Sequence, residues 1–186
     1  MLKIYPKVEE FVKESYGGKR SLDHFYRTVY WAKELKPDTD EAFCVAALAH
    51  DIERSQKIVP IDPETTKKTH YQDPDYLKNH SEASAEIVKD FLEKENVEKG
   101  FIDRVVHLIS RHEVGGDDDQ NLLKDADSIS FLENNIDTFL SKHVEMFGKE
   151  AVQGKFDFMY NRITSSEGKK FAKPFYDDAC KRLEAM

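Results

Sequence analysis

Cysteine is scarce in this chain of 186 residues, which has only two, Cys44 and Cys180. They lie far apart in apolar, helix-like segments, so we expect buried, reduced thiols and no disulfide. No stretch is apolar over the roughly 20 residues that a membrane span needs. The N-terminus lacks the apolar core of a signal peptide. These absences predict a cytoplasmic protein that does not bind a membrane.

Positive charge is also in deficit, with 28 Lys and Arg against 36 Asp and Glu and a net charge of −8. No basic stripe is present, so we do not expect a nucleic-acid polymer as a partner. A small anionic substrate would therefore need a metal ion or a few local basic residues. Phosphate-binding and dinucleotide-binding glycine motifs, the Gly-x-Ser-x-Gly elbow and paired cysteines are missing as well, which removes several enzyme classes.

Alternating strand patterns are nearly absent, and helical spacing of apolar residues dominates. It recurs over residues 8–12, 25–35, 43–50, 83–92 and 102–109, and three or four further helices should follow, with breaks near Gly148 and at 165–168. The polar stretch 55–75 holds three prolines and is predicted to be a loop or lid, which could bring Lys67, Lys68 or His70 to a site. The length suits one core. We predict a single all-α domain over residues 1–186.

The dipeptide His50-Asp51 closes the apolar, helix-like run 42–49. A buried His-Asp pair needs partners that neutralise it. His24 lies upstream on one helix-like segment, and Asp125 and Asp127 lie downstream on another. Imidazole nitrogens and carboxylate oxygens together suit a divalent ion held inside a helical bundle. The alternative is that His50 caps the carbonyl groups of its helix while Asp51 is solvated.

The two downstream aspartates cannot both be ligands easily, because residues two apart on a helix point to nearly opposite sides. A helical wheel through Leu122, Ala126 and Ile129 leans slightly toward Asp125 as the inward residue. The residues alone leave this choice open.

Three blocks carry a family resemblance: residues 23–27 with His24, residues 47–52 with His50-Asp51, and residues 122–127. In this order the blocks resemble the HD-domain superfamily of metal-dependent phosphohydrolases over about residues 20–140. The resemblance implies a helical bundle with a metal-binding core at about 20–140 and C-terminal helices at about 141–186. It also implies one or two divalent ions (Mn, Co, Fe, Ni, Zn or Mg), and the implied ligands are His24, His50, Asp51 and Asp127.

The resemblance extends to residues around the ligands. Asp125 and Arg27 remain candidates for side chains that contact the ligands and orient them. Two blocks around His80 and His112 look like extra-histidine segments of the superfamily, and these residues could hold a second metal or the substrate phosphate. The alternative is that they are ordinary polar residues. Because His107 and His112 are five apart, at most one points inward, and His112 fits better.

The chemistry implied by the resemblance is hydrolysis by metal-activated water. Asp51 would bind the metal and also orient or deprotonate the water. Arg54 lies one turn further, where many relatives place a phosphate-binding lysine, and arginine binds phosphate in a bidentate manner. Arg27 and Lys57 are weaker candidates for the same work, and Lys57 is better explained as an exposed cation.

The leading function is therefore hydrolysis of a phosphomonoester or phosphodiester of a small molecule, with nucleotides as an example. Two alternatives stay open: a di-iron oxygenase of the same fold that uses His80 and His112, and a metal or nucleotide sensor without turnover. The Gly-Tyr-Pro extension typical of cyclic-di-GMP phosphodiesterases is absent after His112-Glu113. A homodimer is compatible with a helical enzyme of this size.

Overall fold

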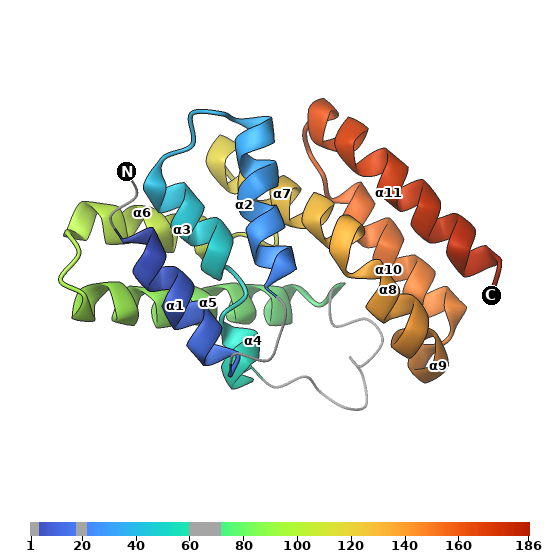
Figure 1. Cartoon of the computed structure of the whole chain (residues 1–186), viewed down its shortest axis with the longest axis horizontal. Helices are drawn as coiled ribbons and strands as arrows, with labels where there is room; N and C mark the ends of the chain where they lie inside the picture. Colours follow the sequence, from blue (N-terminus) through green and yellow to red (C-terminus); the bar gives the residue numbers. More distant parts are fainter. Residues whose placement is uncertain (1–3, 18–21, 60–71) are drawn as a thin grey trace.

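The structure, a computed structural model, describes residues 4–17, 22–59 and 72–186. Within these ranges every regular element is a helix and no strand occurs (Figure 1). The elements are α1 (Tyr5–Ser15), α2 (Asp23–Leu35), α3 (Glu41–Ala49), α4 (Glu53–Gln56), α5 (Pro74–Lys94), α6 (Lys99–Ile109), α7 (Asp118–Asn134), α8 (Ile136–Thr138), the π-helix η2 (Phe139–His143), α9 (Val144–Phe147), α10 (Lys149–Asn161) and α11 (Ser166–Glu184).

Helix α3 is the buried element of the N-terminal half. All its residues from Ala42 to Ala49 are buried, and α1, α2 and α6 pack around it (Figure 1). Four of these residues are alanines, whose small side chains let neighbouring helices approach closely. Asp40 caps the helix, since its carboxylate accepts a hydrogen bond from the Phe43 amide at 2.8 Å. The run 42–49 therefore forms a helix without a polar face. Its C-terminal end lies in the interior of the protein, so the next residues, His50 and Asp51, begin there.

Helix α7 connects the two halves of the molecule. It packs against α2 on one side and against α10 and α11 on the other. Its residues 123–132 are all buried, polar ones included. A capping box formed by Asp117 and Gln120 fixes its start, because each side chain binds the other residue's amide. Polar residues of α7 thus lie in the interior, where they need partners.

The C-terminal helices begin and end where the sequence indicates. Gly148 has a φ of +84°, a value that glycine adopts readily, and separates α9 from α10. The Ser165 side chain accepts a hydrogen bond from the Gly168 amide and caps α11. Cys44 and Cys180 are both free thiols. None of the helices in the described ranges combines the length and apolar character needed to cross a membrane.

Candidate metal centre

The His50-Asp51 pair lies at the inner end of α3. His50 ends the helix and is fully buried, and Asp51 occupies the turn before α4. His24 is the second residue of α2, and Asp127 lies in the middle of α7. Because α2 packs against both α3 and α7, these four residues from three distant parts of the sequence meet in one place.

His24, His50 and Asp127 form the first part of the cluster. Asp127 Oδ1 lies 3.1 Å from His24 Nε2 and 3.3 Å from His50 Nε2. Asp51 adds an oxygen, since one ligand atom from each of His24, His50 and Asp51 lies within 4.8 Å of the others. Two imidazoles and two carboxylates from three helical regions therefore converge. This is the donor set of a transition-metal or zinc site.

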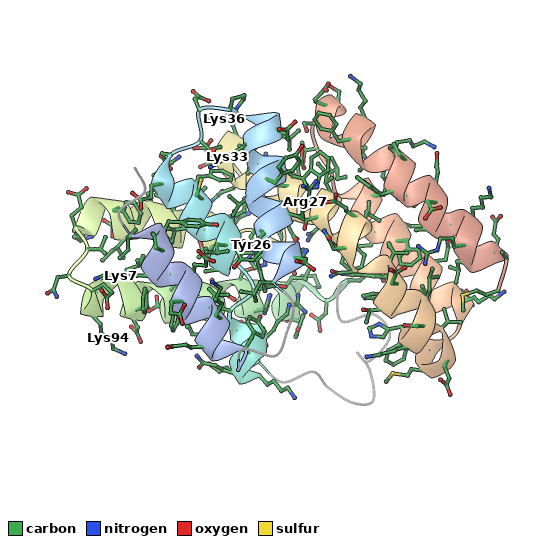
Figure 2. The ribbon with its side chains drawn as sticks, in the orientation of Figure 1. Lys7, Tyr26, Arg27, Lys33, Lys36 and Lys94 are labelled. Atoms are coloured by element: carbon green, nitrogen blue, oxygen red, sulfur yellow. The ribbon has the colours of Figure 1, made fainter. Side chains whose placement is uncertain are left out.

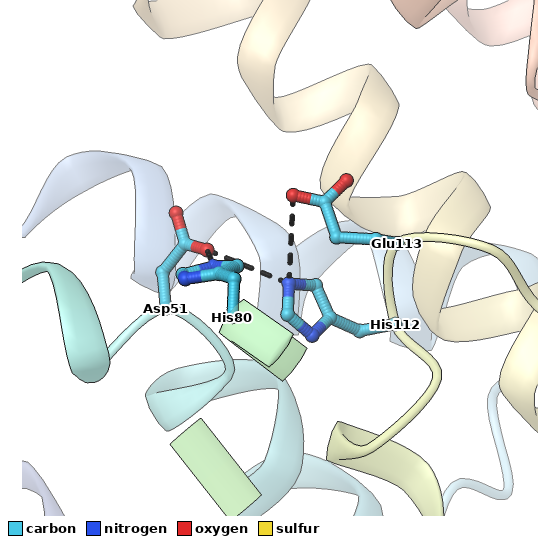
Figure 3. Close-up of side chains that lie close together, drawn as sticks. All are labelled: Asp51, His80, His112 and Glu113. Atoms are coloured by element: carbon cyan, nitrogen blue, oxygen red, sulfur yellow. Dashed lines mark hydrogen bonds and ion pairs between the residues drawn. The ribbon is translucent and has the colours of Figure 1, made fainter. Parts of the chain in front are cut away.

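Asp51 also belongs to a second part of the cluster, with His80 and His112 (Figure 3). Its Oδ1 lies 2.8 Å from His80 Nε2 and 3.5 Å from His112 Nε2. Glu113 Oε1 lies 3.8 Å from His112 Nε2. The Asp51 carboxylate is thus common to two adjacent groups of donors, as a carboxylate between two cations would be.

The other ring nitrogen of each histidine is anchored by the protein. Nδ1 of His50 lies 2.9 Å from the Ala47 carbonyl oxygen, and Nδ1 of His112 lies 2.9 Å from that of Ile109. A carbonyl oxygen can only accept, so each Nδ1 carries a proton, and Nε2 is the nitrogen that faces the carboxylates of the cluster.

His24 and His80 are oriented in the same way. The Ser130 hydroxyl donates to the His24 carbonyl oxygen at 2.6 Å and is left to accept from His24 Nδ1 at 3.0 Å. His80 Nδ1 binds Glu53 Oε2 at 2.7 Å. Metal-binding histidines characteristically donate their second nitrogen to a carbonyl, carboxylate or other oxygen, which fixes ring and tautomer.

The buried nitrogens provide a test of whether a cation fits. Among the described residues, Nε2 of His50 and Nε2 of His112 are buried side-chain atoms without a hydrogen-bond partner. A buried polar atom in this state costs free energy. Both atoms point at carboxylate oxygens of the cluster, so a divalent cation among them would satisfy both nitrogens and neutralise the carboxylates. The residues present fit a metal ion.

The electrostatics of the cluster agree with this fit. Burial lowers the pKa of His50, but the Asp51 and Asp127 carboxylates outweigh burial and raise it to about 9. Burial tends to raise the pKa of Asp51, yet Arg54 and His50 hold it well below its ordinary value. Burial dominates at His112 and lowers its pKa. Without a cation, the carboxylates therefore keep a proton on His50.

Two arginines bind the outer carboxylate oxygens. Arg54 Nε lies 2.7 Å from Asp51 Oδ2, and its Nη2 donates to Glu113 Oε1 at 3.3 Å. Arg162, the residue that follows α10, donates to both Glu113 and Asp127. The two guanidinium groups help to lower the pKa of Glu113 to about 2, against the effect of burial. The acidic residues of the cluster are therefore ionised and held in place at neutral pH.

A cavity of about 580 Å³ opens beside the cluster. His24, Asp51 and Asp127 form part of its wall, together with residues of η2 and α10. Lys155 of α10 lines it too, with Nζ 5.1 Å from the centre of the Phe131 ring. Burial lowers the pKa of Lys155 to about 8. The cavity is large enough for a small organic ligand.

Two candidate supporting residues have other partners, which corrects the expectation for them. Arg27 lies on the side of α2 turned toward α7 (Figure 2), where its Nε donates to Glu133 at 2.7 Å and its guanidinium stacks 3.8 Å from the Tyr30 ring centre. Asp125 accepts hydrogen bonds from the Thr164 and Ser165 amides at 2.7 and 2.8 Å. Arg27 makes no hydrogen bond to a cluster residue, and Asp125 ties α7 to the turn before α11.

The remaining histidines and lysines differ in exposure and in distance from the cluster. His107 is half exposed and pairs with Asp117 at 2.6 Å, away from the cluster. Lys57 is exposed, as expected. His143 is half-buried and lines the cavity. Lys67, Lys68 and His70, with most of the predicted lid, lie outside the described residues.

Sequence reasoning missed four residues of the site: Glu53, Glu113, Lys155 and Arg162. Glu113 follows His112 directly, so its position gave a weak signal. Lys155 lies on the face of α10 that also presents Val152 and Met159 to the cavity, and Arg162 follows directly after the end of this helix. No motif marks them, because their role depends on how α10 packs on α7.

Comparisons with known proteins identify a family and a similar fold. A family model described as Domain of unknown function (DUF4202) matches residues 5–181. The chain belongs to this family. No curated protein matches the DUF4202 chain. A solved structure described as a predicted HD superfamily hydrolase, from an uncultured Thermotogales bacterium, is similar with a TM-score of 0.62 at 17% identity, covering 98% of this chain and 90% of that one.

This likeness shows the fold of the DUF4202 chain. The prediction of an all-α bundle of the HD-domain type is confirmed. The buried His and carboxylate cluster supports the coarser prediction that the chain could hold a metal, and it leaves the identity of the metal open.

Proposed function

We propose that this protein is a metal-dependent phosphohydrolase that cleaves a phosphomonoester or phosphodiester of a small molecule. One observation carries the proposal. Four histidines, each anchored through Nδ1, direct Nε2 toward the carboxylates of Asp51 and Asp127 in a buried cluster at the wall of a cavity. The likeness to a protein described as a predicted HD superfamily hydrolase supports the same reaction class.

The cluster would hold one cation through His24, His50, Asp51 and Asp127. His80, His112 and Glu113 would hold a second one, with Asp51 common to both. A bound divalent cation supplies a Lewis acid and lowers the pKa of a coordinated water toward neutrality. Mn, Co, Fe, Ni, Zn and Mg are all compatible with this donor set.

The remaining steps fall to the side chains of the chain itself. The Asp51 carboxylate would orient the attacking water and accept its proton. Arg54 lies at the same cavity wall and would bind a phosphoryl oxygen, and Lys155 would add a second positive charge there. A wall with these cations favours an anionic substrate. Nucleoside monophosphates and sugar monophosphates are the first compounds to test.

The decisive experiment is a hydrolysis assay on chelator-treated protein, with each divalent cation added back. The panel contains an aryl phosphate, nucleotides and sugar phosphates. We expect phosphate release that depends on the cation and is lost in His50→Ala and Asp51→Asn. His107→Ala, which removes a half-exposed imidazole outside the cluster, should keep its activity. Release that survives both chelation and His50→Ala would contradict the proposal.

The histidine-rich second group favours one further candidate. Asp51 between two donor groups also suits two irons in an oxygenase. Iron analysis and oxygen consumption with the same panel distinguish this function from hydrolysis, because an oxygenase consumes oxygen and a phosphohydrolase does not. Tight nucleotide binding without any product in either assay would favour a sensor instead.

A further inference from the structure

The cavity extends well beyond the metal cluster. A volume of about 580 Å³ lies within the range of sites that enclose a small organic molecule, and it exceeds the needs of a phosphate group. The wall opposite the metal-binding cluster is built by the C-terminal end of α7, by α8, η2 and α9, and by one face of α10. Its apolar and ring-bearing residues are Phe131, Phe139, His143, Phe147, Val152 and Met159.

Three rings of this wall come from one short segment. The π-helix η2 begins at Phe139 and ends at His143, and their ring centres are 4.1 Å apart. Phe147 follows in α9, with its ring centre 5.5 Å from that of His143 and the rings nearly perpendicular. All three side chains are half-buried. A π-helix is rare and often marks a functional site, and here it sets two rings side by side at a cavity wall.

Among the described residues that line this wall, the one charged side chain is Lys155, whose Nζ lies 5.1 Å from the centre of the Phe131 ring. Burial, with Lys142 nearby, lowers the pKa of His143, so its imidazole is a neutral ring at neutral pH. The polar groups of the wall are the amides of Asn134 and Asn135 and the Thr138 hydroxyl. Aromatic faces next to amide groups suit a flat ring that carries hydrogen-bonding atoms.

We propose that this wall binds a planar aromatic or heteroaromatic ring of the substrate, attached through a short linker to the phosphate that the cluster holds. The inference rests on the proposed function for the position of the phosphate. The shared chemistry is the ring. It could be a simple aryl group or a nucleobase, and the experiment below separates these two sources.

The test compares two non-hydrolysable ligands on the Mn²⁺-loaded protein by calorimetry. Phenylphosphonate and methylphosphonate share the anionic head and differ in the ring. We expect phenylphosphonate to bind at least about tenfold tighter, as burial of an aromatic group predicts. His143→Ala and Phe147→Ala should each reduce this ratio severalfold and leave methylphosphonate affinity unchanged.

Two further elements complete the design. Met146→Ala is the matched control, since Met146 precedes Phe147, is 65% exposed and lies outside the cavity lining, so it should leave the ratio unchanged. Phe139 packs against the buried Phe156, so its truncation would mix binding with stability and is avoided. Phosphate release from a nucleoside monophosphate, phenyl phosphate and a sugar phosphate then identifies the source of the ring. A higher kcat/KM for the nucleotide assigns a nucleobase, and equal values for the two ring compounds assign an aryl group.

Each outcome decides between the two proposals. Equal affinity for both phosphonates, or a ring preference that survives in His143→Ala and Phe147→Ala, overturns the ring inference even if phosphate esters are hydrolysed. A ring preference lost in both variants, without hydrolysis of any ester, supports the ring site and overturns the proposed function. No binding of either phosphonate overturns both.

Discussion

Asp125 and Asp127 lie two residues apart on α7 and face opposite sides of the helix. Asp127 Oδ1 faces Nε2 of His24 and His50, whereas Asp125 accepts the Thr164 and Ser165 amides before α11. Both carboxylates are buried, but Asp127 contacts imidazole rings and Asp125 contacts backbone amides. The same residue type thus has two different partners within one turn of helix.

This difference predicts that two matched substitutions affect two different properties, the stability of the fold and the affinity for a cation. Asp125→Ala should lower the free energy of unfolding by about 2–3 kcal/mol, because two backbone amides lose the buried, charged acceptor of their hydrogen bonds. It should leave affinity for a divalent cation within about twofold. Asp127→Ala should weaken cation binding at least about tenfold. Denaturant unfolding and calorimetric titration measure the two quantities, and loss of cation binding in Asp125→Ala alone would contradict the assignment.

Cation binding should weaken as pH falls. The pKa of His50 is raised to about 9, so at pH 7 its imidazole carries a proton that an incoming cation must displace. The affinity should therefore rise with pH by up to about tenfold per unit between pH 6 and 9. Titrations in buffers of different ionisation enthalpy should show release of about one proton at pH 7. An affinity that stays constant from pH 6 to 8 would be incompatible with this account.

Lys155 should contribute to binding at the expense of stability. Its folded-state pKa of about 8 lies below the ordinary lysine value, so the unfolded chain binds more protons between the two. The unfolding free energy of the wild type should therefore rise relative to that of Lys155→Met as pH increases from 8 to 10. At pH 7, Lys155→Met should be at least as stable as the wild type, and its KM for phosphate esters should increase about tenfold or more. Stability and KM that both stay unchanged would remove Lys155 from the site.

Arg162 and a divalent cation should stabilise the same carboxylates. Arg162 binds Glu113 and Asp127, and its Nε donates to the Ser128 hydroxyl at 2.7 Å. Arg162→Met leaves two buried carboxylates without this partner, so in a chelator the unfolding free energy should fall by about 3–5 kcal/mol. Added Mn²⁺ should recover part of the loss, because the cation neutralises the same groups. A variant equally destabilised with and without Mn²⁺ would argue against a cation at Asp127.

The sequence predicted the helices well where local signals are strong. The apolar run 42–49 predicted a helix packed into the interior, and α3 covers this run with all of it buried. Gly148 and Ser165 marked real helix ends, because their backbone and capping requirements are local. The π-helix η2 carried no such signal. Its first residue, Phe139, contacts the rings of Phe131 and Phe156 on two other helices.

The positions of the metal-type residues could be anticipated, whereas their supports could not. His50-Asp51 stood out because polar residues ended an apolar run, and the family resemblance selected His24 and Asp127. The helical wheel favoured Asp125. A wheel indicates which residues are buried, but it does not indicate what a buried residue contacts. Asp125 is indeed buried, but against backbone amides. Lys155 lies on α10 and Arg162 directly follows it, and because the docking of α10 against α7 is a matter of tertiary packing, no pattern in the sequence indicated them.

The central claim is that a divalent cation binds among His24, His50, Asp51 and Asp127. Its most direct test is a crystal of the protein grown with Mn²⁺, with data collected to locate anomalous scatterers. The account predicts an anomalous peak within bonding distance of Nε2 of His24 and His50, and its absence in His50→Ala crystals grown in the same way. A wild-type map without a peak at this cluster, from protein that binds Mn²⁺ elsewhere or not at all, would contradict the claim.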